Sequence, residues 1–182
     1  MDRSKVPAVL SIAGSDSSGG AGIQADIKTI TAHRLYAETA ITAITAQNTL
    51  GVTAVQDISP DIVAAQIDAV FDDIRPSAVK IGMVSSVEII DVIADRLSAW
   101  KATNVVVDPV MVATSGARLI AEDAAEALTR RLFPLATVIT PNIPEAMALL
   151  DYEVDSERTQ QNAAMLLTRR FGCASLVKGG HL

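Results

Sequence analysis

The feature that most limits the fold of this chain is the regular alternation of short apolar runs with longer stretches of helical periodicity. Aliphatic and β-branched runs of this length are typical of strands that are buried on both faces. Because a helical stretch follows most of the runs, the pattern predicts right-handed crossovers between parallel strands. The sequence therefore predicts an α/β protein with three layers, α/β/α, around a mainly parallel sheet.

Local start signals help to place the helices. Ser59-Pro60-Asp61 indicates a helix start, because proline is tolerated in the first turn and an acid suits the helix dipole there. Ser85 and Glu88 have capping-box spacing, and Asn142-Ile143-Pro144-Glu145 is a strong helix start. The predicted strands are residues 9–13, 39–45, 51–58, 78–81, 105–107, 137–140 and 174–177. The predicted helices are residues 22–32, one from Pro60, one from Ser85 to Trp100, 121–132, one from Asn142, and 157–170.

Composition narrows the class of protein. The 182 residues contain no linker or internal repeat, so residues 1–182 are predicted to form one domain. Aromatic residues make up only 3%, so Ala, Val, Ile and Leu must build the core. A net charge of −6 without a basic stripe argues against general binding to nucleic acid or to an anionic membrane. The N-terminal apolar run is too short to span a membrane, and the single cysteine, Cys173, favours a reducing, cytoplasmic location and buried packing.

The residues that follow the predicted strands are unusually polar or glycine-rich. In open α/β sheets, ligands bind in the crevice beyond the carboxyl ends of the strands. Functional residues are therefore expected to cluster in these segments. They are residues 14–16, 47–48, 82–83, 108–110, 142–145 and 178–180.

The glycine-rich segment of residues 14–22, GSDSSGGAG, is the first candidate for a ligand-facing loop. It is not a Walker P-loop, because Gly20 stands where the lysine belongs. A dinucleotide fingerprint starting at Gly20 lies too far beyond the predicted strand end at Gly14 to make the required tight turn. A plain flexible loop is the alternative, but backbone close to a ligand at a helix start is the favoured interpretation.

Four residues, three of them after predicted strands and one in a predicted helix, are weighed here as members of a binding site. Gln47 carries an amide that donates and accepts side by side, which matches the edge of an aminopyrimidine, while a turn is the alternative. Asp26 lies in the first turns of a helix, where a solvated acid is common. Met83 and Val110 fit a pocket wall or the core equally well on composition alone.

Four more residues are candidates for a phosphate or metal site. Asp108 ends an all-valine strand and is suited to Mg²⁺, or alternatively to capping a loop. Asn142 and Glu145, taken alone, are better explained as a helix cap and a first-turn acid. Lys178 precedes two glycines, which places a cation beside a possible anion-binding nest, and a surface turn is the alternative.

These segments together resemble the hydroxymethylpyrimidine/phosphomethylpyrimidine kinases, which are thiamine-biosynthesis members of the ribokinase-like superfamily. The resemblance covers the whole chain and rests on an ordered set of motifs, part of which the pyridoxal kinases share. The motifs are residues 13–26 (AGSDSSGGAGIQAD), 47–49 (QNT), 80–83 (KIGM), 108–111 (DPVM), 140–146 (TPNIPEA) and 177–181 (VKGGH).

The resemblance implies phosphorylation of 4-amino-5-hydroxymethyl-2-methylpyrimidine, and then of its monophosphate, by ATP with Mg²⁺. It implies that the pyrimidine pocket is lined by Gly14, Ala21, Asp26, Thr45, Gln47, Met83 and Val110. It also implies that Asp108, Asn142, Glu145 and Lys178 bind the cofactor and its phosphates, with Asp108 and Glu145 as the metal ligands. A homodimer is expected from the resemblance alone.

The family's later Gly-Thr-Gly-Cys segment, which supplies an anion hole and the reactive cysteine, belongs beyond Leu182, the last residue of this sequence. The resemblance therefore implies a ribokinase-like domain that is incomplete at its C-terminus, with no catalytic residue among the 182 and little kinase activity of its own. Three hypotheses stay open. The chain is part of such a kinase, a naturally shortened pyrimidine-binding domain without catalysis, or a kinase of the pyridoxal type.

Overall fold

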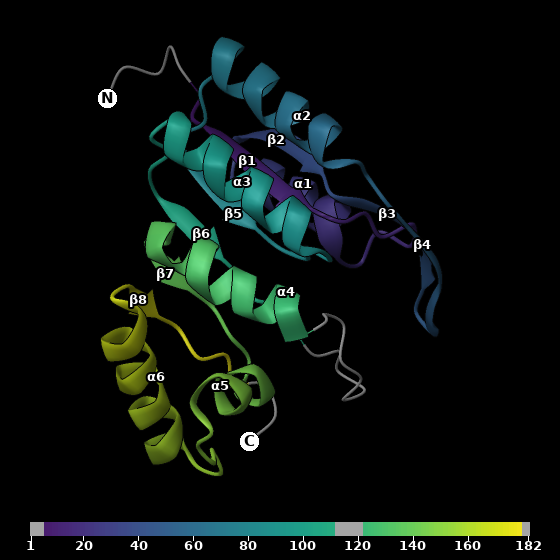
Figure 1. Ribbon diagram of the computed structural model, residues 1–182. Helices are drawn as coiled ribbons and strands as arrows, with labels where there is room; N and C mark the ends of the chain where they lie inside the picture. The colour runs from purple at the N-terminus through teal and green to yellow at the C-terminus, as the bar shows by residue number, and fades with distance from the viewer. Residues whose placement is uncertain (1–5, 112–121, 180–182) are drawn as a thin grey trace.

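The computed structural model describes residues 6–111 and 122–179. Its main sheet has six strands in the order β2-β1-β5-β6-β7-β8, and every neighbouring pair is parallel (Figure 1). The strands are β1 (Ala8–Ala13), β2 (Tyr36–Ile41), β5 (Ala78–Ile81), β6 (Val105–Val107), β7 (Val138–Ile139) and β8 (Ala174–Ser175). The prediction of a mainly parallel sheet is confirmed.

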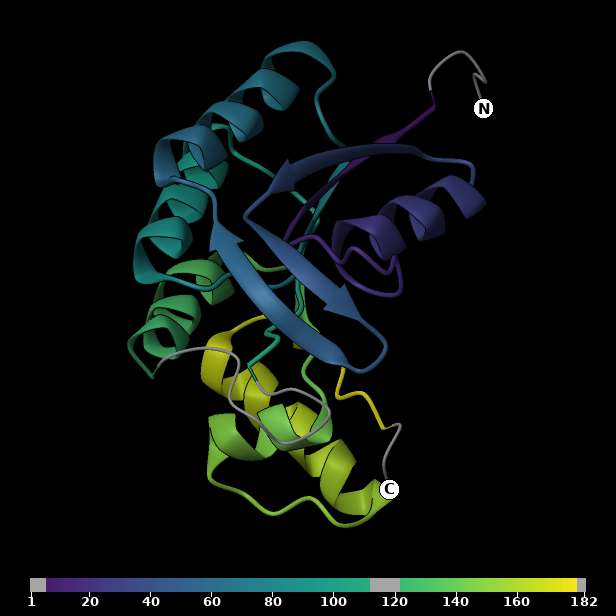
Figure 2. The same ribbon diagram turned by 90° about the vertical axis from the view of Figure 1, so that its right-hand side faces the viewer.

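Helices cover both faces of this sheet, as the three-layer prediction requires. Figure 2 shows α2, α3 and α4 along one side of the sheet and α1 on the other, while α5 packs against α6 and α6 against β8. The helices are α1 (Gly22–Ala32), α2 (Pro60–Asp73), α3 (Val87–Ala99), α4 (Glu122–Ala127), α5 (Ile143–Leu150) and α6 (Glu157–Phe171). In the parts of the chain that the structure describes, none of these helices combines the length and the apolarity that a bilayer crossing needs.

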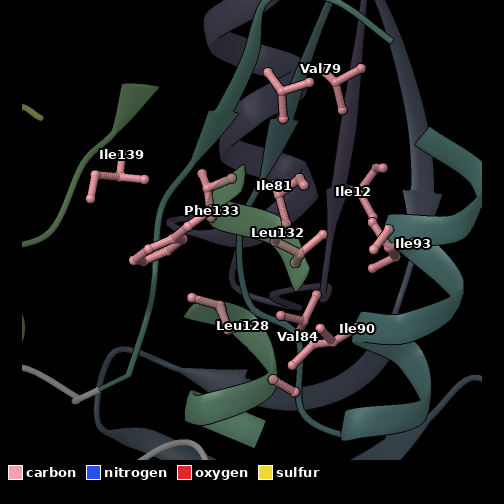
Figure 3. Close-up of a cluster of buried hydrophobic side chains, with 14 of the residues drawn as sticks. Ile12, Val79, Ile81, Val84, Ile90, Ile93, Leu128, Leu132, Phe133 and Ile139 are labelled. Atoms are coloured by element: carbon pink, nitrogen blue, oxygen red, sulfur yellow. The ribbon is translucent and has the colours of Figure 1, made fainter. Parts of the chain in front are cut away.

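The core is aliphatic, as the low aromatic content predicts. Ile81 of β5 is fully buried, and so are Ile90 and Ile93 of α3. Leu132 and Phe133 close the same cluster from the segment after α4 (Figure 3). The ring of Phe133 makes an edge contact with that of Phe171, with centroids 4.8 Å apart, which joins α6 to this core.

A two-stranded antiparallel ribbon, β3 (Ala43–Asn48) and β4 (Gly51–Asp57), is separate from the main sheet and extends beyond its end (Figure 1). The prediction of one strand over residues 39–45 is therefore wrong. The chain leaves the sheet at the buried Thr42, whose backbone N–H donates to Ala13 O and whose hydroxyl donates to Met83 O. These tertiary hydrogen bonds interrupt the strand, although the β-branched and apolar stretch of residues 39–45 is continuous in the sequence.

Other element ends also differ from the predicted ones. Ser86 rather than Ser85 caps α3, because Ser85 donates its hydroxyl to Asp57 at 2.7 Å and so ties β4 to the helix start. The helix predicted over residues 121–132 divides into α4 and a π-helical turn (Leu128–Leu132), and a 3₁₀ turn that contains a proline (Phe133–Leu135) follows; residue 121 lies outside the described residues. β7 and β8 are each two residues long and so shorter than predicted.

Glu38 of β2 is a buried carboxyl group whose Oε2 has no hydrogen-bond partner within the described residues. Burial, and then the negative charge of Asp73, raises the pKa of Glu38 from 4.5 to about 7. The folded state therefore favours the protonated form. The stability that this protonation contributes is fully present below pH 4.5 and is lost as the pH rises through about 7.

Glu38→Gln is expected to raise the free energy of unfolding at pH 8 by about 1–3 kcal/mol, because the variant has no charge to bury. At pH 4 the two proteins are expected to differ little. Urea unfolding at both pH values measures this, with the exposed Glu153→Gln as the control. An identical change at the two pH values would contradict the prediction.

Candidate functional site

A cavity of about 530 Å³ lies where the carboxyl ends of the main-sheet strands meet the β3–β4 ribbon. Each contributing strand is followed by residues that line it, so the crossover topology brings together segments far apart in the sequence. Every site residue predicted above, except Thr45, lines this cavity. They are Gly14, Ala21, Asp26, Gln47, Met83, Asp108, Val110, Asn142, Glu145 and Lys178.

Asp16 organises the glycine-rich loop from its centre, a role that the sequence analysis missed. Its Oδ1 accepts hydrogen bonds from the backbone N–H and the hydroxyl of Ser18 at 2.9 and 2.8 Å. Its Oδ2 accepts from the N–H groups of Gly20 and Ala21 at 3.0 and 2.8 Å. The Ser18 hydroxyl, followed by these backbone N–H groups, lowers the pKa of Asp16 against the opposing effect of burial. The loop is thus held in place, and three of its backbone N–H groups are directed to Asp16 rather than to a ligand.

The β3–β4 ribbon is joined to this loop by reciprocal hydrogen bonds. Ser17 donates its hydroxyl to Gln47 O at 2.6 Å and accepts from Gln47 N at 2.8 Å. Thr45 donates its hydroxyl to Ser15 O at 2.8 Å, and its N–H donates to Ser15 Oγ. Thr45 therefore lies behind the cavity wall, where it fixes the ribbon.

The side-chain amide of Gln47 remains available to a ligand. Its Oε1 lies 3.3 Å from Thr45 Oγ1, but the single hydroxyl proton of Thr45 has the nearer acceptor in Ser15 O. The register of the ribbon shifts between Ala46 and Gln47, where Thr53 of β4 has no paired residue and donates its hydroxyl to Ala46 O at 3.1 Å. A bulge of this kind bends the ribbon locally, next to Gln47.

Asp26 occupies the opposite wall of the same cavity. Its Oδ2 accepts from Ser11 Oγ at 2.6 Å and from Lys80 Nζ at 2.8 Å, so it is not the freely solvated acid that the sequence also allows. Met83 covers Gly14 so closely that a Cβ at Gly14 would lie 2.6 Å from Met83 Cε. Because Gly14 has no side chain, the thioether of Met83 can lie in the cavity wall.

Asp108 and Lys178 form an ion pair at the end of the cavity nearest β6 and β8. Lys178 Nζ lies 2.6 Å from Asp108 Oδ1, and the two side chains are 42% and 24% exposed. Val110 has φ +41°, a strained conformation for a β-branched residue, which marks a chain path constrained by its surroundings.

Two predictions concern residues that follow Lys178 in the chain. Gly180, the second glycine of the predicted anion nest, lies outside the described residues. Leu182, beyond which the resemblance places the family's reactive cysteine, also lies outside the described residues. The expectation that none of the 182 residues is the catalytic base therefore stays a prediction.

Glu145 connects two strand ends. Its Oε2 accepts from Asn142 N at 2.8 Å, and its Oε1 accepts from Met111 N at 2.9 Å. Asn142 in turn accepts from Glu145 N, so the predicted helix start is a complete capping box. Because both carboxylate oxygens already accept hydrogen bonds and the residue is 2% exposed, Glu145 acts as a structural clamp in this state.

The carboxylates at this end of the cavity could supply at most one or two ligands to a divalent cation. Mg²⁺ in phosphoryl-transfer sites is bound by one or two carboxylates together with phosphate oxygens and water. Asp108 has such an oxygen to offer, whereas Glu145 has only the second lone pairs of oxygens that are already engaged. In residues 6–111 and 122–179, three or more His, Cys, Asp or Glu side chains do not cluster as a metal site would need.

Cys173 lies away from the cavity, just before β8. It is buried, and burial raises the pKa of its thiol. A buried thiol with a raised pKa is a poor nucleophile. The interpretation of Cys173 as packing is therefore supported by its surroundings.

Comparison with known proteins gives the chain its family. A family model described as phosphomethylpyrimidine kinase matches residues 16–182. A hydroxymethylpyrimidine/phosphomethylpyrimidine kinase of Rhizobium meliloti is 55% identical over 176 residues, which are 95% of this chain and 65% of that protein. A crystal structure of phosphomethylpyrimidine kinase from Clostridium difficile 630 superposes with a TM-score of 0.90 at 48% identity, covering 98% of this chain and 77% of that one. A Bacillus subtilis pyridoxal kinase in an ADP complex has a TM-score of 0.83 at 39% identity, over 93% of this chain and 64% of that one.

The chain thus spans just under two thirds of the length of the Rhizobium meliloti relative. The matched region includes nearly all of the glycine-rich loop and every later strand end that lines the cavity. The chain belongs to the phosphomethylpyrimidine kinase family.

Proposed function

We propose that this chain provides the pyrimidine-binding part of a kinase that transfers phosphate from ATP to 4-amino-5-hydroxymethyl-2-methylpyrimidine and to its monophosphate, in the biosynthesis of thiamine diphosphate. The observation that carries the proposal is the convergence of Gln47, Asp26 and Gly14 on one cavity that also contains the Asp108–Lys178 pair. Related proteins with this activity in their names support it.

The cavity has two chemically different ends. Gln47, Asp26, Met83 and Val52 provide an amide, a carboxylate and apolar contacts, which suit a flat amino-substituted ring. Lys178 and the other residues of the β6–β8 end provide charge where phosphate groups would lie. Phosphoryl transfer depends mainly on positioning and on charge neutralisation, and both ends serve that purpose.

Asp108 is the residue that we assign to Mg²⁺, and Glu145 is a more distant contributor that would act through water. A bound Mg²⁺ neutralises charge on the transferring phosphate oxygens. Asp108 would orient the ion, while Lys178, now paired with Asp108, would turn toward phosphate. Asn142 holds the start of α5 at this edge of the cavity through its capping box.

We expect the 182-residue chain to bind the pyrimidine but to have little kinase activity. Among the described residues, the acids that line the cavity are already engaged: Asp26 and Asp108 pair with lysines, and Asp16 and Glu145 accept backbone N–H groups. The oxygens of Asp26 and Asp108 that stay free are the ones we assign to the ring and to Mg²⁺, so neither acid is assigned as the general base. Robust ATP turnover by a mass-verified sample of this chain would contradict this expectation.

Gln47→Ala is expected to weaken pyrimidine binding by about 1–3 kcal/mol, because the ring edge loses its hydrogen-bond partner. Isothermal calorimetry with 4-amino-5-hydroxymethyl-2-methylpyrimidine measures the change. Gln56→Ala is the matched control, since Gln56 is an exposed residue of the same ribbon that does not line the cavity. Equal affinities of wild type and Gln47→Ala would remove Gln47 from this role.

The same calorimetry separates the other candidate functions. Pyridoxal kinases share this fold, so a clear preference for pyridoxal over the pyrimidine would replace the proposed substrate. A natural protein of 182 residues that binds the pyrimidine without turnover would instead be a non-catalytic binding domain. The intact mass of the natural protein, read beside the calorimetry, distinguishes that case from a kinase of family length.

We further propose that the protein is a cytoplasmic homodimer. The β3–β4 ribbon exposes Leu50 by 94%, Val55 by 55% and Ile44 by 46%, and a second copy would cover these apolar groups. The buried free thiol of Cys173 is compatible with a reducing compartment. Sedimentation equilibrium of the chain is expected to give twice the monomer mass, and a monomer at all concentrations would contradict the dimer.

A further inference from the structure

Ser11 and Lys80 lie side by side beneath the pyrimidine end of the cavity. They are paired in register on the neighbouring parallel strands β1 and β5, so their side chains leave the same face of the sheet. That face is covered by α1, which carries Asp26. The sheet therefore presents two hydrogen-bond donors to one carboxylate of the helix above it.

Both donors bind the same oxygen. Ser11 Oγ lies 2.6 Å and Lys80 Nζ 2.8 Å from Asp26 Oδ2, while no hydrogen bond to Oδ1 forms within the described residues. Ser11 is fully buried, and the side chains of Lys80 and Asp26 are 28% and 20% exposed. The carboxylate is thus fixed through Oδ2, and Oδ1 is left to accept hydrogen from a ligand.

The Lys80 ammonium group lies directly against the backbone at Gly82. A Cβ at Gly82 would lie 2.8 Å from Lys80 Nζ and 3.0 Å from Ala13 Cβ, so the ammonium group occupies space that any other residue at position 82 would fill. The KIGM segment therefore places the cation and also leaves room for it.

We propose that Ser11 and Lys80 are positioning residues that make the site selective for an amino group on the pyrimidine ring. With Oδ2 held, Oδ1 of Asp26 accepts one hydrogen of the exocyclic amine, and the other hydrogen is left to the Gln47 amide on the facing wall. An analogue with a carbonyl oxygen at that ring position would place one acceptor against another, which buried polar sites reject strongly. This inference rests on the proposed function, because it assumes that the cavity binds the pyrimidine.

The test compares the dissociation constants of the 4-amino pyrimidine and its 4-oxo analogue by calorimetry. Lys80→Met removes the cation, and Gly82→Ala keeps the cation but displaces it. In both variants we expect the affinity for the amino compound to fall about tenfold or more, while that for the oxo compound changes by less than about threefold. Ser11→Ala, which leaves Lys80 in place, is expected to show the same trend with a smaller loss.

Thr39→Val is the matched control. Thr39 pairs in register with Ser11 on the other neighbouring strand, β2, and its hydroxyl makes no hydrogen bond to Asp26. The ratio of the dissociation constants for the amino and oxo compounds is expected to be the same in Thr39→Val as in wild type. Thermal unfolding of every variant checks folding, and if Lys80→Met does not fold, Gly82→Ala and Ser11→Ala decide.

The outcomes are separable. An unchanged ratio in the folded variants, or an equal loss of affinity for both compounds, would overturn the positioning role and leave the proposed function intact. A wild type that binds both compounds equally would also overturn it. A wild type that does not bind the amino pyrimidine at all would overturn the proposed function and this inference together.

Discussion

Gly22→Ala is expected to lower the free energy of unfolding by about 3–5 kcal/mol, from backbone strain and overpacking together. Gly22 has φ +55°, and a Cβ there would lie 2.3 Å from Gly14 O and 3.2 Å from Ser15 C. These atoms belong to the backbone, which cannot move aside as a side chain can. Urea unfolding measures the loss.

Gly172→Ala is the control for Gly22→Ala. Gly172 caps α6 at φ +72°, and nothing lies within 4 Å of the Cβ position. Its substitution therefore reports the conformational strain alone, which is about 1 kcal/mol. Equal losses for the two variants would show that the loop relaxes around the new methyl group and would refute the steric argument.

Glu145→Ala is expected to lower the free energy of unfolding by about 3–5 kcal/mol, because it leaves the N–H groups of Met111 and Asn142 without partners and opens a void in a buried region. Glu145→Gln is expected to lose about 1–3 kcal/mol, since the amide keeps one acceptor of the two. Faster hydrogen exchange at the Met111 amide should accompany both losses.

Glu157→Ala is the matched control for this clamp. Glu157 is also an acid in the first turn of a helix, but it is exposed. Its replacement is expected to change stability by only a few tenths of a kcal/mol, up to about 1 kcal/mol, through the helix dipole. A loss at Glu145 no larger than that at Glu157 would mean that the bonds to Met111 and Asn142 contribute nothing beyond the dipole.

The parallel sheet and the cavity could be predicted from the sequence because both follow from hydrophobic periodicity and from the topology of parallel sheets. Apolar runs with polar ends predict parallel strands, and parallel strands place their carboxyl ends at one edge. That logic located Gly14, Met83 and Asp108 around one cavity without any knowledge of side-chain direction. It also recognised the helix start at Asn142, whose capping box is local in sequence.

The partners of the site residues were not accessible in the same way. Lys80 and Asp26 are 54 residues apart in the sequence, and Lys178 and Asp108 are 70 apart, so no local sequence pattern indicates either ion pair. Asp16 is different, because an aspartate followed by Ser-Ser-Gly-Gly is a signal for side-chain to backbone hydrogen bonds. The sequence analysis attributed the role of that segment to its glycines and gave no role to Asp16.

The four hydrogen bonds that converge on Asp16 have a consequence for binding energetics. A loop that is already ordered loses little conformational entropy when a ligand arrives, so more of each contact's free energy appears as affinity. A ligand that enters the cavity would therefore meet this loop without a prior rearrangement of its backbone. In this protein the glycines keep the backbone free of side chains beside the cavity, and one aspartate provides the stiffness.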